Sequence, residues 1–119
     1  MPKETLGSTW TAIALRNAIH SGAVSAQEVC ESYLDRIQKT DAMWNSMTAV
    51  FRDEVLAQAA AVDQAPRTTT QPQPLLGVPV TVKDVLCTRG NLTTAASRIL
   101  SGFRPPYDAT VVSRLKQAG

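Results

Sequence analysis

The sequence predicts an α/β fold whose sheet is incomplete within the chain. Apolar residues recur at helical spacing through residues 1–64, and a stretch rich in proline and threonine, residues 65–74, interrupts every periodicity. Residues 75–119 begin with strand-like alternation, continue as a long loop and end in a short helical pattern. That is half of an α/β unit, because a parallel sheet needs a second strand after the helix. We therefore expect a helical segment, a linker and the truncated start of an α/β core.

Three helices are predicted in the first segment. The first is expected over Thr9–Ser21, with Gly22 as its left-handed C-cap. The letters SAQE, which begin at Ser25, have the spacing of a capping box and start a second helix that runs to about Thr40. A third, alanine-rich helix is expected near Arg52–Asp63, where small side chains would allow another element to approach closely.

Two stretches alternate between apolar and other residues, as a strand does. Within Leu75–Asp84, three valines alternate with proline, threonine and Lys83, which predicts a strand that ends at Lys83. The lysine would lie on the face opposite the valines. The shorter stretch WNSMTAVF is compatible with either a short strand or an extended connector before the third helix.

The region after Lys83 has no long periodicity until the last residues of the chain. It is rich in threonine, serine and glycine, and loops of this length in a compact domain are usually functional or disordered. Asp108 is placed to cap a final helix. The apolar residues of that helix would be Val111, Val112 and Leu115.

The composition argues against several classes of function. The 119 residues are 44% hydrophobic and 18% charged, as in an ordinary folded protein. From Lys83 onward six basic residues stand against two acidic ones, but they are singly spaced, so direct nucleic-acid binding is not expected. His20 has no metal-binding neighbour at ligand spacing, and no metal site is predicted. Two distant cysteines, without a signal or a membrane-length apolar run, indicate a cytoplasmic protein.

Lys83 has two interpretations on the residues alone. A lysine at the end of a strand commonly extends its ammonium group into water. Alternatively, it serves as a base, because burial or a neighbouring cation can lower the pKa of a lysine towards neutrality. Ligand sites in α/β sheets gather beyond the carboxyl ends of strands, where Lys83 would lie.

Several motifs together resemble the amidase signature family. LLGVPVTVKD is followed by TRG, TTAAS and PPYDATVVSRLKQAG, and the stretch SAQEVCESYLDRIQKTDAMWNSM is similar to the opening of family members. The resemblance spans nearly the whole chain and weakens only in the linker. Within the family, it is closest to the A subunit of tRNA-dependent amidotransferases. The fold that it implies for residues 75–119 is the first part of a mixed β-sheet core.

The resemblance also implies a site built on Lys83. Family members use a lysine as general base, a serine in a cis-peptide arrangement and a nucleophilic serine, and Lys83 matches the lysine. Both serines and the oxyanion-hole amides belong to a Gly/Ser-rich stretch that has no counterpart in these 119 residues. Ser97 and Ser101 lie outside such a stretch, so neither is assigned as nucleophile. The chain by itself is therefore expected to be inactive.

For a complete family protein, the resemblance implies hydrolysis of glutamine to glutamate and ammonia. Partner subunits would then amidate misacylated glutamyl-tRNA(Gln) or aspartyl-tRNA(Asn) with ATP and magnesium, while this chain would hold no cofactor. Two alternatives stay open. The chain could belong to a stand-alone amidase that acts on another small amide, or it could be a short non-enzymatic helical protein that binds a partner.

Overall fold

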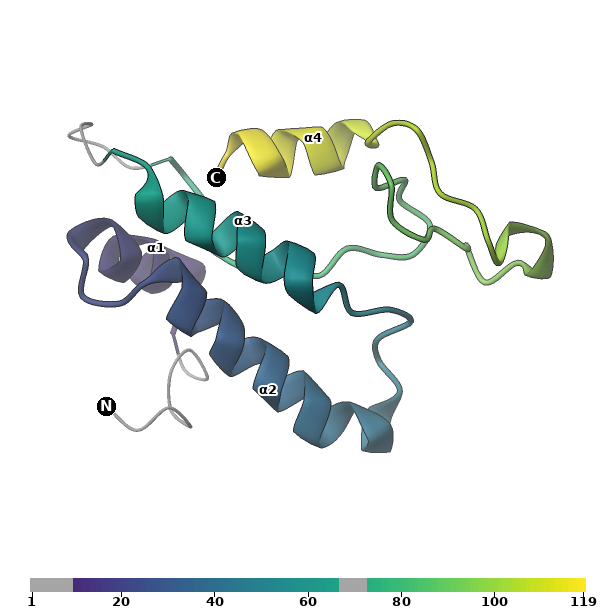
Figure 1. Ribbon diagram of the computed structural model, residues 1–119, viewed down its shortest axis with the longest axis horizontal. Helices are drawn as coiled ribbons and strands as arrows, with labels where there is room; N and C mark the ends of the chain where they lie inside the picture. The colour runs from purple at the N-terminus through teal and green to yellow at the C-terminus, as the bar shows by residue number, and fades with distance from the viewer. Residues whose placement is uncertain (1–9, 67–72) are drawn as a thin grey trace. The chain divides into compact units, whose positions relative to one another are not determined.

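The computed structural model describes residues 10–66 and 73–119, which form two compact units. The described residues up to Pro79, together with Gly119, make the first unit, and Val80–Ala118 make the second. Of the described helices, none is long and apolar enough to cross a membrane. The regular structure described is entirely helical: α1 (Ala12–Ser21), α2 (Ala26–Trp44), α3 (Arg52–Gln64), the 3₁₀-helix η2 (Arg98–Leu100) and α4 (Thr110–Gln117) (Figure 1).

Helix α1 begins and ends at residues with capping chemistry. The predicted start, Thr9, lies outside the described residues. The helix begins at Ala12, because the hydroxyl of Thr11 accepts the N–H of Ala14 at 3.2 Å. At the other end Gly22 has a φ of 76° and donates its N–H to the last turn, so the predicted left-handed C-cap is confirmed.

The N-terminus of α2 has its first N–H groups bound by side chains. The hydroxyl of Ser25 accepts the N–H of Glu28 at 3.0 Å, and the carboxylate of Glu28 accepts the N–H of Ser25 at 2.9 Å, which confirms the capping box. Asp63, near the end of α3, accepts the N–H groups of Ala26 at 2.8 Å and Gln27 at 3.0 Å. Its negative charge also suits the positive end of the helix dipole. One carboxylate therefore caps α2 and ties it to α3.

Helices α2 and α3 pack side by side and run in opposite directions (Figure 1). Arg52, the first residue of α3, forms an ion pair of 3.1 Å with Asp35 of α2. Both side chains are exposed, so this pair contributes at most about 1 kcal/mol. Helix α2 continues past the predicted end at Thr40 to Trp44, where Asn45 adopts a left-handed conformation with a φ of 48° and ends it.

The carboxylate of Asp41 holds the start of the connector between α2 and α3. It accepts the N–H and the hydroxyl of Ser46, at 2.9 and 2.5 Å, and the N–H of Met47 at 3.3 Å. These bonds, the Ser46 hydroxyl first, lower the pKa of Asp41. Of the two possibilities that the sequence left open here, the connector is the one found, since no residue between α2 and α3 forms a strand.

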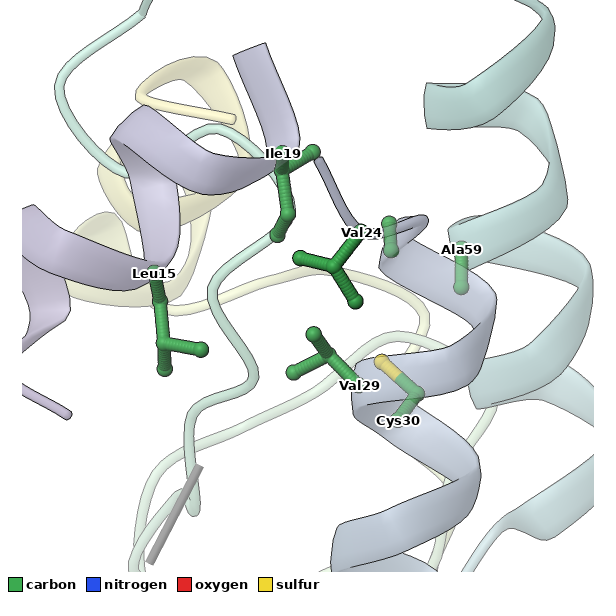
Figure 2. Packing of buried hydrophobic residues seen from close by; sticks show 7 residues of the cluster. Leu15, Ile19, Val24, Val29, Cys30 and Ala59 are labelled. Carbon is green, nitrogen blue, oxygen red and sulfur yellow. The ribbon is translucent and has the colours of Figure 1, made fainter. Parts of the chain in front are cut away.

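The core of the first unit gathers residues from its three helices and from the turn before α2 (Figure 2). Val29 of α2 is completely buried, and Ile19 of α1 is only 1% exposed. The α3 member is Ala59, whose small side chain suits the close contact between α2 and α3. The remaining members are Leu15, Val24, Ala26 and Cys30.

Cys30 is a packed thiol within this core. Burial, followed by the negative charge of Asp63, raises the pKa of its thiol to about 11. The thiolate, which is the reactive form, is therefore scarce at neutral pH.

Gly77 lets the segment before the second unit lie against this core. Its φ of 67° is in the left-handed region, and its N–H donates to the carbonyl of Gly119 at 2.8 Å. A Cβ at this position would lie 2.9 Å from Cδ1 of Ile19 and 3.0 Å from Cβ of Ala26. The residues on either side pack against the core. Both the backbone conformation and the close approach therefore require glycine.

The predicted strand that ends at Lys83 is wrong for the described chain. No residue in 10–66 or 73–119 pairs as a strand, and residues 78–83 have no regular structure. A strand exists only through hydrogen bonds to a neighbour, which an alternating pattern alone does not supply. Val80 and Val82, expected on a covered face, are 50% and 40% exposed. Of the predicted α/β class, the structure thus shows only the helices. Most of the expected linker, 65–74, lies outside the described residues.

Substitution of Gly77 tests the close approach to the core. Gly77→Ala should lower the free energy of unfolding by about 1–3 kcal/mol, because the methyl group meets Ile19 and the backbone keeps a left-handed conformation. Chemical denaturation followed by circular dichroism measures the change. Gly102→Ala is the control, since a Cβ there meets no heavy atom within 4 Å. The control should shift stability by no more than about 0.5 kcal/mol, and equal effects at both glycines would contradict the packing.

The two free thiols should differ in reactivity. Cys30 is buried with a raised pKa, whereas Cys87 is only half-buried. Near pH 8, iodoacetamide should modify Cys30 on the order of a hundredfold more slowly than an unfolded cysteine, because little thiolate is present. The rate should rise as the pH approaches 11. Peptide mass spectrometry gives the rates, with a urea-unfolded sample as control, and rapid modification of Cys30 in the folded chain would show that this burial is wrong.

Candidate functional site

Lys83 lies at the start of a turn in the second unit, and its side chain is exposed. Its carbonyl accepts the N–H of Leu86 at 2.9 Å, which closes the turn. Among the residues that the structure describes, its ammonium group has no ion-pair partner. The burial expected at a strand end is absent, because no strand forms here. The backbone of Lys83 is therefore held while its ammonium group is free.

Asp84 binds three consecutive N–H groups of a second turn, ten residues along the chain. Its Oδ1 accepts the N–H of Thr94 at 2.9 Å, while its Oδ2 accepts the Thr94 hydroxyl at 2.5 Å and the N–H of Ala96 at 3.5 Å. The main-chain carbonyl of Asp84 accepts the N–H of Ala95 at 3.3 Å. These bonds, the Thr94 hydroxyl first, hold the pKa of Asp84 below its ordinary value. The second turn is thereby fastened to the residue that follows Lys83.

This second turn, Thr94–Ser97, has a strained backbone. Ala95 and Ala96 have φ values of 47° and 56°, in the left-handed region. An alanine in that region costs on the order of 1 kcal/mol relative to a right-handed one. The N–H of Ser97 donates to the carbonyl of Thr94 at 2.8 Å and closes the turn. The hydrogen bonds to Asp84 offset the strain, so the turn depends on that residue.

Two stretches of the second unit, residues 87–93 and 103–109, run antiparallel to each other. Arg104 reinforces the pairing with a bond of 2.7 Å from its guanidinium to the carbonyl of Gly90. The main-chain bonds are too widely spaced to form a ladder, so neither stretch is a strand. The sequence pattern of this region predicts a loop and gives no sign of the pairing. The bonds join Cys87 with Ala109, Gly90 with Pro105 and Thr93 with Phe103, at 2.8 to 3.0 Å.

Asp108 ties the two antiparallel stretches to α4. Its carboxylate accepts the N–H of Arg89 at 2.7 Å and pairs with the ammonium of Lys116 at 2.8 Å. These two contacts, Lys116 first, lower the pKa of Asp108. The predicted role of Asp108 as N-cap is wrong, although the helix itself is confirmed. The cap position is Ala109, which has no side-chain cap bond, and Asp108 lies one residue too early.

The other candidate groups of the chain do not assemble into a site. In the described ranges, no group of three or more His, Cys, Asp or Glu residues could hold a metal ion. Ser97 and Ser101 flank η2, where Ser97 makes no side-chain cap bond. The thiol of Cys87 donates to the hydroxyl of Tyr107 at 3.6 Å, a contact that raises the pKa of Tyr107. Nothing here gives either serine a nucleophilic role.

Asp84 is the candidate that sequence reasoning missed. Its signal in the sequence was only its place directly after Lys83. Its partner Thr94 lies ten residues away in a stretch without periodicity, and alanine is a residue type that rarely adopts the left-handed conformation found at Ala95 and Ala96.

The chain was compared with models of known protein families, and one of them matches most of it. The family model described as Amidase matches residues 28–119. This range contains Lys83, Asp84 and the turn Thr94–Ser97.

Curated proteins named as the A subunit of glutamyl-tRNA(Gln) amidotransferase match most of the chain. The protein from Corynebacterium jeikeium (strain K411) is 45% identical over 113 residues, which cover 94% of this chain and 23% of that protein. The protein from Thermobifida fusca (strain YX) is 47% identical over 109 residues, which cover 92% of this chain and 22% of that protein. The chain thus spans less than a quarter of the length of these relatives.

A solved structure is also similar. It is described as an unexpected vestigial protein complex that reveals the evolutionary origins of an s-triazine catabolic enzyme. The likeness has a TM-score of 0.84 and 35% identity, and it covers 92% of this chain and 24% of that chain. The inhibitor-bound form of the complex gives a TM-score of 0.83.

Asp108 should make the stability of the chain depend on acid pH. Its folded pKa is lowered, so its contribution is full above the unfolded pKa and is lost as the pH falls through the folded pKa. Asp108→Asn should therefore lower the melting temperature at pH 7 and reduce its fall on acidification to pH 3. Thermal melts across this range measure both effects. Asp53→Asn is the control, because that exposed carboxylate has no hydrogen-bond partner in the described part of the chain. Identical pH profiles for the two variants would contradict the role of Asp108.

Proposed function

Because the chain belongs to the amidase family, we propose that it provides the N-terminal part of an amide-hydrolysing enzyme in which Lys83 is the general base. The observation that carries the proposal is the family match over residues 28–119, which includes Lys83. The backbone of Lys83, which the turn to Leu86 holds in place, also supports it.

In the proposed mechanism, Lys83 acts as a proton acceptor. In its neutral form the lysine accepts a proton from a serine, which in turn takes the proton of a nucleophilic serine. The nucleophilic serine attacks the amide carbon, and the proton returns from the lysine through the first serine to the leaving nitrogen, which departs as ammonia. Water then hydrolyses the acyl-serine that remains. A general base contributes only about 10²- to 10⁴-fold and does not replace a nucleophile or an oxyanion hole. The 119 residues alone should therefore be inactive.

We further propose that the amide is glutamine and that the ammonia passes to partner subunits. The curated relatives are named for glutamyl-tRNA(Gln) amidotransferase, and this name supports the substrate class. ATP and magnesium would serve the partner subunit that amidates the misacylated glutamyl-tRNA(Gln) or aspartyl-tRNA(Asn). This chain would bind neither of them and would not contact the tRNA directly. The reaction would take place in the cytoplasm.

A second candidate function is hydrolysis of another small amide by a stand-alone amidase. The observation that favours an amide other than glutamine is the 35% identity to a chain of the complex described for the origins of an s-triazine catabolic enzyme. The two candidates share Lys83 as base and differ in the amide that is hydrolysed.

A chimera tests the proposed function. Residues 1–119 would replace the matching segment of the amidotransferase relative from Corynebacterium jeikeium, produced with its partner subunits. The chimera should release ammonia from glutamine, and Lys83→Ala should reduce this at least about 10²-fold because the proton acceptor is gone. Lys83→Arg should be nearly as damaging, since a guanidinium stays protonated. Lys116→Arg is the matched control and should retain activity within about twofold, because arginine keeps the positive charge that pairs with Asp108.

Two outcomes would contradict the proposal. A folded chimera that hydrolyses no glutamine would overturn the proposal that residues 1–119 provide the N-terminal part of such an enzyme. A fully active Lys83→Arg variant would rule out Lys83 as the base. Thermal melts of every variant show whether a loss of activity reflects a loss of folding.

A further inference from the structure

We propose that Asp84 is a positioning residue for Lys83 in amide hydrolysis, an inference that rests on the function proposed above. Asp84 follows Lys83 directly in the chain. Its two carboxylate oxygens and its carbonyl accept the successive N–H groups of Thr94, Ala95 and Ala96, at 2.9, 3.3 and 3.5 Å. Three main-chain N–H groups thus donate to one residue, Asp84. These bonds hold the turn Thr94–Ser97 against the segment that carries Lys83.

The simpler interpretation is that Asp84 only stabilises a loop, as Asp108 does. Asp108 binds one main-chain N–H and has Lys116 as an ion-pair partner. Asp84 has no such cation within the ranges that the structure describes. It binds instead a turn in which two consecutive alanines, Ala95 and Ala96, are left-handed. Strain of this kind persists only where surrounding contacts impose it, and it is concentrated at functional sites.

A fixed backbone beneath a free side chain is what a general base requires. The carbonyl of Lys83 is bound by the N–H of Leu86, and the next residue is bound to the turn Thr94–Ser97. The lysine is therefore held from its C-terminal side while its side chain is exposed. A base must lie within hydrogen-bond reach of the proton that it takes, and a misplacement of about 1 Å costs about a hundredfold in rate. Loss of the Asp84 contacts should therefore lower kcat more than it changes KM.

The contact to Thr94 allows the inference to be tested without changing the charge beside Lys83. In the chimera defined above, Asp84→Asn and Thr94→Val should each lower kcat for glutamine about ten- to a hundredfold, with KM within about twofold. The kcat of the double variant should lie within about twofold of the kcat of the slower single variant. Both substitutions break the same contact, the one between the Thr94 hydroxyl and the Asp84 carboxylate. Asp108→Asn is the matched control: it removes the same charge and one main-chain bond and should keep kcat within about twofold.

A second measurement does not depend on activity. Hydrogen–deuterium exchange by mass spectrometry should show residues 94–97 exchanging at least about tenfold faster in Asp84→Asn, but not in Asp108→Asn, because Asp84 accepts the N–H groups of this turn. Unchanged exchange at residues 94–97 would overturn the positioning role, and so would full kcat in Asp84→Asn or an equal loss in Asp108→Asn at the same melting temperature. If the unsubstituted chimera folds but hydrolyses no glutamine, the proposed function fails separately, and the exchange at residues 94–97 still decides whether Asp84 fastens this turn to the segment that carries Lys83.

Discussion

Aspartate carboxylates bound to main-chain N–H groups are the interaction on which both units depend. An N–H group outside a helix or a sheet needs another acceptor, and the described part of this chain has no sheet. Asp63 binds the first turn of α2 from α3, and Asp41 binds the start of the connector. Asp84 and Asp108 fasten the loops of the second unit. Asp63, Asp84 and Asp108 join segments that are ten or more residues apart, whereas Asp41 acts over five and six residues.

In the second unit this interaction determines the surroundings of Lys83. No ladder of a strand holds the lysine in the described residues, and the Asp84 carboxylate and the turn to Leu86 hold it instead. The chain thus supplies the position of the proposed base. It does not supply the burial that the strand pattern led us to expect. The neighbouring valines are also exposed, in keeping with a segment that packs little against its own chain.

Local features were predictable from the sequence, and contacts between distant residues were not. The caps at Ser25 and Gly22 act within a few residues, so their spacing was sufficient to place the end of α1 and the start of α2. The strand failed because its pairing would need a partner that no pattern in the sequence identified. Lys83 was found through the family resemblance, which the comparisons confirm, while its role stays a prediction. The contact between Asp84 and Thr94 had no periodic signal, because it joins two irregular turns.

The measurement that tests this account most directly is a pH titration of Asp84 by NMR, which follows its carboxyl carbon together with the amide of Thr94. The account predicts that Asp84 titrates below the ordinary pKa of an aspartate, because the Thr94 hydroxyl and the main-chain N–H groups bind its charged form. The Thr94 amide resonance should move with the same midpoint, and an Asp84→Asn spectrum assigns the signal. Titration at the ordinary value, with a Thr94 amide that does not respond, would contradict the account, because nothing would then fasten the turn beside Lys83.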